Sequence, residues 1–190
     1  MCNVFLSHQE IETICSLLGK KISSRYRFNE IPPVAIGLLN NGIPFTLELT
    51  QKIDIPVQID YLQVGCNSEL MSENSITLIK DVSVDLMNRD IILIEAEVDS
   101  GFSHKYIVEY LSKKYNPKSI TSVALINRPS KRKTQINLDF YGKEADDEFL
   151  VGFGLEYKNF YSNTDYIYTP NEQELAKMDK FEKKSSRVGK

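Results

Sequence analysis

The sequence predicts an α/β fold in which helices flank both faces of a mostly parallel, twisted sheet. Helical and strand-like segments alternate along the 190 residues. The strand-like segments are continuous apolar runs, which is typical of strands buried on both faces. Polar turns follow three of these runs directly, at residues 40–42, 95–103 and 127–129. In such sheets ligands bind beyond the carboxyl ends of the strands, so we expect the three turns to meet at one crevice.

The composition excludes several classes of protein. The formal net charge of −3 argues against a sequence-independent nucleic-acid binder, which needs a basic face. The sequence shows no apolar run of about 20 residues, so we expect no membrane span, and no signal peptide is apparent. Cys2, Cys15 and Cys66 show no metal-binding spacing, which favours reduced thiols in a cytoplasmic protein.

The first elements are indicated by caps and turns. Ser7 and Glu10 have capping-box spacing, and apolar residues at helical intervals predict a helix over residues 8–25. Residues 34–39 are an apolar run, which predicts a buried strand that ends at a tight turn. Pro44 suits the first turn of a second helix, and residues 57–64 alternate as a second strand does.

The middle of the chain is more polar. We expect an exposed, mobile loop over residues 65–75, and a hairpin-like pair of strands at residues 76–79 and 82–86. Residues 91–94 carry the strongest buried-strand signal of the chain.

The last third continues the alternation. The pattern predicts a helix over residues 103–115, a buried strand over residues 120–126 and a further strand at residues 149–153. From residue 171 the chain is rich in Lys, Glu and Ser. We expect a short helix there, followed by several disordered residues.

An acidic segment and a Ser-Gly-x-Ser run follow the strand at residues 91–94. Small residues let the backbone approach a phosphate, the hydroxyls of Ser100 and Ser103 can donate to its oxygens, and a helix N-terminus supplies N–H groups. Glu95, Glu97 and Asp99 would repel a phosphate, so we expect them to serve ribose hydroxyls, a divalent cation or a base nitrogen. The alternative is a polar loop that merely caps the helix, and the motif alone leaves this open.

Residues 94–103 read I-E-A-E-V-D-S-G-F-S, which resembles the V-E-D-I-I-D-T-G-x-T of the hypoxanthine-guanine phosphoribosyltransferases. Residues 55–61, 125–129 and 147–157 are similar to that family's L-P-V-x-V-D-F, L-L-D-K-P and D-E-F-V-V-G-Y-G-L-D-Y, in the same order and spacing. The resemblance covers about residues 7–170. It implies that residues 1–170 form one domain with the type I phosphoribosyltransferase fold, which includes a small hood region. Residues 171–190 would then be a polar, partly disordered tail.

The resemblance implies a purine-salvage reaction. Hypoxanthine or guanine would join the phosphoribosyl group of phosphoribosyl pyrophosphate, with Mg²⁺, to give a nucleoside monophosphate and pyrophosphate. It also implies a homo-oligomer. Asp99 would lie near purine N7 as the acid/base group. The other implied ligands are Ser100, Gly101, Phe102 and Ser103 for the 5′-phosphate, Glu95 and Glu156 for ribose and metal, Arg128, Phe149 and Leu150 for the base, and Asn40, Asn41 and Gly42 for pyrophosphate.

The chain departs from the family mainly at the pyrophosphate, metal and loop-closure end. Glu97 is acidic, but it points to the opposite side of the strand from the family's second acidic position, where this chain has alanine. The base-binding lysine is replaced by arginine, which is bulkier and planar. The departing residues are Ala96, Arg128, Glu156, Asn41 in the turn, Cys66-Asn67 in place of a Ser-Tyr pair, and Ser162 in place of an arginine.

Three interpretations of the function therefore stay open. The first is an active hypoxanthine-guanine phosphoribosyltransferase. The second is a catalytically weakened homologue that acts as a nucleotide-binding or regulatory protein. The third is a phosphoribosyltransferase for another base, with Arg128 as the discriminating residue. We expect His8 on a helix surface and His104 at a helix N-terminus, neither with a catalytic role.

Overall fold

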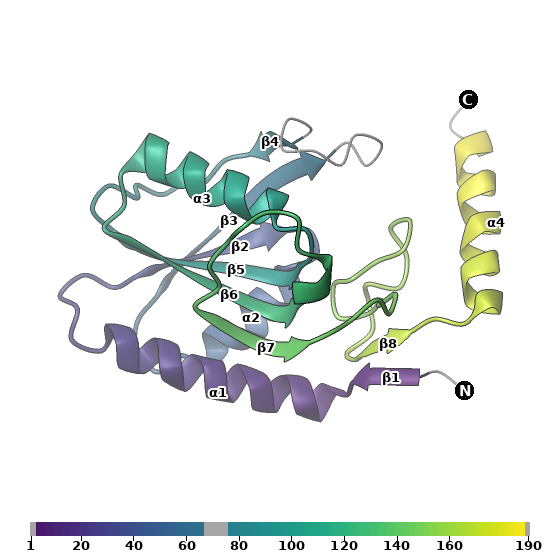
Figure 1. The fold of residues 1–190 in the computed structure, drawn as a ribbon, viewed down its shortest axis with the longest axis horizontal. Coiled ribbons are helices and arrows are strands. Elements are labelled where there is room, and N and C mark those ends of the chain that lie inside the picture. The colour runs from purple at the N-terminus through teal and green to yellow at the C-terminus, as the bar shows by residue number, and fades with distance from the viewer. Residues whose placement is uncertain (1–2, 67–75, 189–190) are drawn as a thin grey trace.

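Six strands form the central sheet of this computed structural model, which describes residues 3–66 and 76–188. Their order is β4-β3-β2-β5-β6-β7, and only β4 is antiparallel to its neighbour (Figure 1). A separate two-stranded sheet pairs β1 with β8. The strands are β1 (Asn3–Leu6), β2 (Val34–Leu39), β3 (Gln58–Cys66), β4 (Ile76–Lys80), β5 (Asp90–Val98), β6 (Ser119–Asn127), β7 (Phe140–Glu144) and β8 (Ile167–Thr169).

Helices cover both faces of the sheet, as the sequence predicts. Figure 1 shows α3 on one face and α1 and α2 on the other, while α4 stands apart near β8. Two separate apolar clusters fill the spaces between the helices and the sheet. The helices are α1 (His8–Tyr26), α2 (Ile43–Gln51), α3 (Phe102–Tyr115) and α4 (Glu172–Val188), and a short 3₁₀ turn spans Pro129–Lys131.

The central strand β5 is buried on both faces, and this decides where its acidic residues point. Ile92 and Ile94 pack in the cluster under α1 and α2, together with Ala96. Ile91 and Leu93 pack in the cluster under α3. Because side chains alternate along a strand, Glu95 and Glu97 lie on the α3 side and Ala96 on the other.

The capping box at the start of α1 is present. The Ser7 hydroxyl accepts from the backbone N–H of Glu10, and the Glu10 carboxylate accepts from the backbone N–H of Ser7 at 2.8 Å. These two bonds satisfy donors that a helix start otherwise leaves unpaired. Pro44 stands in the first turn of α2, as expected.

The predicted hairpin of residues 76–79 and 82–86 is wrong. β4 is present, but it pairs with β3. Residues 82–86 form no strand, because the Asp60 carboxylate accepts from the backbone N–H groups of Ser83 and Val84 and holds them in bends. The expected loop begins later than residue 65, since β3 runs to Cys66. Residues 67–75, with Asn67, lie outside the described residues.

The predicted strand at residues 149–153 is also wrong. Val151 makes an isolated bridge to Tyr168, but Gly152, Phe153 and Gly154 all have positive φ, between 49° and 100°. An extended strand requires negative φ, so the chain coils here. Beyond this coil, α4 continues to Val188, past the short helix that the composition predicts.

Candidate functional site

A cavity of about 360 Å³ opens at the carboxyl ends of β2 and β5. It lies where an α/β sheet normally binds ligands. Two of the three turns expected to converge there do so, the one after β2 and the one after β5, whereas residues 127–129 after β6 do not line it. The lining residues are Leu38, Leu39, Asn41, Gly42, Val64, Glu95, Ala96, Glu97, Val98, Asp99, Ser100, Gly101, Ser103, His104 and Leu155.

The loop between β5 and α3 is shaped by a glycine. Gly101 has φ of 85° and is the N-cap of α3. A side chain there would be strained, and its Cβ would also lie 3.2 Å from the side chains of Arg132, Thr134 and Ile136. The glycine therefore lets the backbone turn sharply and direct the first N–H groups of α3 toward the cavity.

The same loop is braced from the chain that follows β6. The carbonyl of Ser100 accepts from the backbone N–H of Lys133 at 3.0 Å, and Arg132 donates to the carbonyl of Asp99 at 2.7 Å. Burial lowers the pKa of Arg132, whereas the nearby Asp99 and Glu95 raise it. These contacts fix the loop, so a phosphate would meet a preformed backbone.

Glu95 is buried against His104. The Nδ1 atom of His104 lies 2.5 Å from Glu95 Oε1, and the two residues are 3% and 5% exposed. His104 is in the first turn of α3, as expected, but its burial beside a carboxylate was not indicated by the sequence. The signal available was a histidine at an apolar position of the helix, three residues before Ile107.

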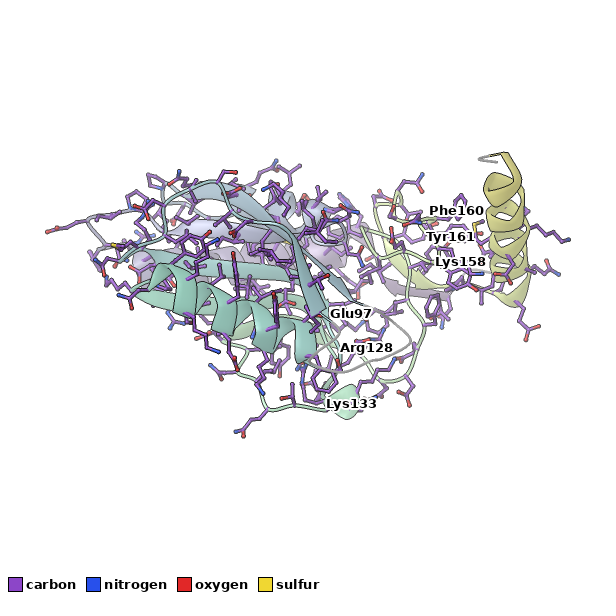
Figure 2. All side chains as sticks on the ribbon, turned by 90° about the horizontal axis from the view of Figure 1, so that it is seen from above. Glu97, Arg128, Lys133, Lys158, Phe160 and Tyr161 are labelled. Atoms are coloured by element: carbon purple, nitrogen blue, oxygen red, sulfur yellow. The ribbon has the colours of Figure 1, made fainter. Side chains whose placement is uncertain are left out.

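Arg128 lies between two carboxylates of the β5 end. Its Nε atom donates to Glu97 and lies 3.1 Å from Asp99 Oδ1, and its Nη1 atom donates to the carbonyl of Asp146. Figure 2 labels Glu97 and Arg128 close to each other at this end of the sheet. Burial raises the pKa of Glu97, the charge of Asp99 raises it further, and Arg128 opposes both. Glu97 thus pairs with a cation and does not replace the carboxylate missing at Ala96.

The residues expected to hold a purine base are not part of the lining of this cavity. Phe149 is 46% exposed, and its ring packs edge-on against Tyr157 at 5.5 Å between centroids. Leu150 is buried, and Glu156 is partly buried. Phe149, Leu150 and Glu156 belong to the segment that contributes Leu155 to the cavity.

The turn after β2 is compact. The N–H of Gly42 donates to the carbonyl of Leu38 at 2.9 Å, and a Cβ on Gly42 would lie 2.5 Å from that oxygen. The peptide bond between Leu39 and Asn40 is cis. Asn41 contacts the opposite segment, since a Cβ on Gly154 would lie 2.1 Å from the Asn41 carbonyl oxygen. The turn and the segment carrying Leu155 are therefore in direct contact.

The described residues contain no preformed cage of three or more metal-ligating side chains. The cavity nevertheless offers carboxylate oxygens from Glu95, Glu97 and Asp99. Mg²⁺ is commonly held by one or two carboxylates together with phosphate oxygens of a substrate, so these hard donors suit it. Within residues 3–66 and 76–188, no helix has the length and apolar character needed to cross a membrane.

Comparison with known proteins identifies the family. Residues 3–158 match the model of the phosphoribosyl transferase domain. The chain is 37% identical to a hypoxanthine-guanine phosphoribosyltransferase of Bacillus subtilis (strain 168), over 86% of this chain and 90% of the relative. A similar relative of Staphylococcus epidermidis is 34% identical over 88% of this chain and 92% of its own length.

The solved structures agree. A hypoxanthine phosphoribosyltransferase of Staphylococcus aureus superposes with a TM-score of 0.84 at 31% identity, covering 90% of this chain and 92% of that one. The predicted type I fold is thereby confirmed. With this fold, this cavity and these relatives, the chain belongs to the hypoxanthine-guanine phosphoribosyltransferase family.

Proposed function

We propose that this chain transfers the phosphoribosyl group of phosphoribosyl pyrophosphate to hypoxanthine or guanine. The products are a nucleoside monophosphate and pyrophosphate, a step of purine salvage. The observation that carries the proposal is the placement of Asp99 directly before a glycine-shaped loop at the N-terminus of α3, both on the wall of one cavity. Family membership supports the same activity.

The 5′-phosphate would bind at residues 100–103. The Ser100 and Ser103 hydroxyls can donate to phosphate oxygens, and the backbone N–H groups around Gly101 and Phe102 add further donors. The positive end of the α3 dipole favours the anion at this position. The N-cap Gly101 has no side chain to cap α3, and the backbone N–H of Phe102 makes only a long contact of 3.5 Å to the Ser100 hydroxyl, which a phosphate oxygen can replace.

The chemical step exchanges one bond for another. The purine N9 atom forms a bond to the ribose C1′ atom, while the bond from C1′ to the pyrophosphate oxygen breaks. The proton that the base loses passes to the Asp99 carboxylate. The side chain of Asp99 is 47% exposed, and it lies 3.1 Å from the Arg128 Nε atom. The carboxylate is therefore both accessible to a ligand and held in place.

The base would stack on Phe149, with the backbone of Leu150 hydrogen-bonded to its edge. Phe149 is 46% exposed and its ring packs against that of Tyr157, which favours an ordered aromatic surface for a purine. Arg128 would act toward purine O6. Because its Nε and Nη1 atoms already donate to Glu97 and Asp146, only part of the guanidinium is left for the base.

Pyrophosphate would bind at Asn40, Asn41 and Gly42. Glu95 and Glu156 would hold the ribose hydroxyls and Mg²⁺, together with substrate oxygens. When bound, Mg²⁺ neutralises charge that develops on the leaving pyrophosphate. Ala96 removes one carboxylate from this end of the site, so we expect weaker binding of the metal-bound substrate than with two carboxylates.

The test is a base-by-base assay. The full chain is incubated with phosphoribosyl pyrophosphate, MgCl₂ and, separately, hypoxanthine, guanine, xanthine and adenine, and the nucleotides are separated by chromatography. We expect inosine and guanosine monophosphates as products. Glu109→Gln, which changes an exposed carboxylate on α3 that pairs with Lys113, is the control and should keep the activity. No nucleotide from any base at high enzyme concentration would contradict the proposal.

A second candidate is a weakened homologue that binds nucleotides without efficient turnover. The observation that favours it is the Glu97–Arg128 ion pair, which occupies the guanidinium beside Asp99, together with Ala96. Calorimetry with inosine and guanosine monophosphates tests it. Binding with turnover far below about 1 per second supports this candidate, and turnover at or above that rate supports the enzyme.

Two further proposals concern the state of the protein in the cell. By resemblance, the chain would form a homo-oligomer, which light scattering of the purified protein tests. From the cysteine usage, we propose a cytoplasmic location, which fractionation of the source cells tests.

A further inference from the structure

A buried hydrogen-bonded chain reaches the candidate ribose site from the α3 side of the sheet. His104 Nδ1 lies 2.5 Å from Glu95 Oε1, and His104 Nε2 lies 3.3 Å from the hydroxyl of Ser122 on β6. All three residues are less than 6% exposed. Leaving a buried carboxylate without a partner is costly, so the histidine is the group that makes burial of Glu95 tolerable.

One neutral tautomer of His104 satisfies every member of this chain. The Ser122 hydroxyl donates to Nε2, and Nδ1–H donates to the carboxylate. Ser122 is itself held, because its backbone N–H donates to Asp139 at 2.9 Å and Asp139 forms an ion pair with Arg25 of α1 at 2.8 Å. Three elements thus fix the position of the imidazole ring.

The imidazole also separates two cavities. His104 and Glu95 line the 360 Å³ cavity of the candidate site, and His104 and Ser122 line a second cavity of about 330 Å³ between α3 and β6. Without the ring, Glu95 would have room to turn away from the site. A glutamate side chain that must be ordered on binding loses rotamer entropy at that moment, whereas one that is already ordered does not.

We propose that His104 is a positioning residue. It holds one oxygen of Glu95, so that the other oxygen faces the 2′ and 3′ hydroxyls of the bound ribose. The inference rests on the proposed function, because it takes Glu95 as the ribose ligand. It adds a residue that the sequence motif does not include, and it predicts that ribose recognition depends on the ring nitrogen Nδ1.

Two matched variants test the nitrogen. The amide nitrogen of His104→Asn lies near the position of Nδ1 and can donate to Glu95, whereas that of His104→Gln lies near the position of Nε2 and cannot. Calorimetry measures the affinity of each protein for inosine monophosphate and for its 2′,3′-dideoxy analogue. In the wild-type protein we expect the hydroxyls to strengthen binding about tenfold or more, as hydrogen bonds to a charged group do.

The quantity compared is the ratio of the affinity for inosine monophosphate to the affinity for its 2′,3′-dideoxy analogue. His104→Asn should keep most of this ratio, and His104→Gln should lower it to within about threefold of one. Equal ratios in the two variants would overturn the positioning role, and so would a wild-type ratio of one. If either variant fails to fold, Ser122→Ala tests the positioning role instead. Loss of the hydrogen bond to His104 Nε2 should lower the ratio of affinities, and an unchanged ratio overturns the inference. The base-by-base assay distinguishes this outcome from a failure of the proposed function. If the proposed function is wrong, the wild-type protein gives no nucleotide product in that assay.

Discussion

The Arg128 side chain is 3% exposed and forms an ion pair with Glu97, across the ends of the neighbouring strands β6 and β5. A buried cation needs a partner, and a buried carboxylate beside a second carboxylate needs a cation. Arg128 replaces the lysine that is usual in the family, and Glu97 follows Ala96, which replaces the usual second carboxylate. The ion pair between Arg128 and Glu97 therefore gives each of these two residues its partner.

Removing both members of this pair should cost less than the sum of the costs of removing each one alone. Arg128→Met leaves Glu97 and Asp99 without their shared cation, and we expect the free energy of unfolding to fall by about 3 kcal/mol. Urea titrations of Arg128→Met, Glu97→Gln and the double variant measure this. We expect the double variant to lose less than the sum of the single losses. Additive losses would show that the two side chains do not interact.

Asp99→Asn should separate chemistry from binding. Asparagine keeps the shape of the side chain and can still accept from the Arg128 Nε atom, but it is a poor proton acceptor. We expect kcat to fall by about 10² to 10⁴, while the affinity for inosine monophosphate changes little. Steady-state kinetics and calorimetry give the two quantities. An unchanged kcat would remove Asp99 from the reaction.

Tyr157 should affect the purine but not the phosphoribosyl substrate. Its ring packs against that of Phe149 at 5.5 Å between centroids, and its hydroxyl donates to Asp179 of α4 at 3.1 Å. An aromatic pair of this kind contributes about 0.5–1.5 kcal/mol, so Tyr157→Leu should raise the KM for the base about two- to tenfold. Tyr157→Phe keeps the ring and serves as the matched control. An equal rise in both substrates' KM values would indicate general damage instead.

Asp81 should give the protein an acid-sensitive contribution to stability. Burial opposes its ionisation, but hydrogen bonds from Lys114, Tyr110 and Tyr115 outweigh burial and lower the pKa of Asp81 to about 2 from 3.8. A lowered pKa in the folded state stabilises the fold above the unfolded value. This contribution is therefore complete above about pH 4 and is lost as the pH falls toward 2.

The variant Asp81→Asn lacks this titration. The difference in free energy of unfolding between wild type and variant should shrink as the pH is lowered from 5 to 2, as followed by urea titration at each pH. Glu109→Gln, at an exposed ion pair with Lys113, is the control for a surface carboxylate. A difference that stays constant over this range would contradict the assignment.

The sequence predicts the central sheet well because the buried strands are continuous apolar runs. β2, β5 and β6 need no knowledge of their neighbours to be recognised, since they are apolar on both faces. β1, β7 and β8 were not predicted, because they have three to five residues each and their pairing depends on distant parts of the chain. The bends at residues 82–86 have the same origin, since Asp60 lies 23 residues from Ser83 in the chain.

Some features of the site could not be predicted from the sequence, for a related reason. The Asp99–Ser103 segment was recognisable because its residues are contiguous. His104 was not, because its role depends on Glu95 and Ser122, which lie on two other elements. The pairing of Glu97 with Arg128 likewise joins positions 31 residues apart. Contacts between elements, rather than local patterns, determine which charges are neutralised.

Gly154 joins two parts of the site that are expected to serve different substrates. Its backbone rests on the Asn41 carbonyl so closely that one added methyl group would force them apart. The segment proposed to hold the purine and the turn proposed to bind pyrophosphate are thus in direct contact, so a change that displaces Gly154 should also displace Asn41. Selection for a larger base through changes in residues 149–157 would alter the affinity for pyrophosphate as well, so the two substrate preferences of this protein would have to evolve together.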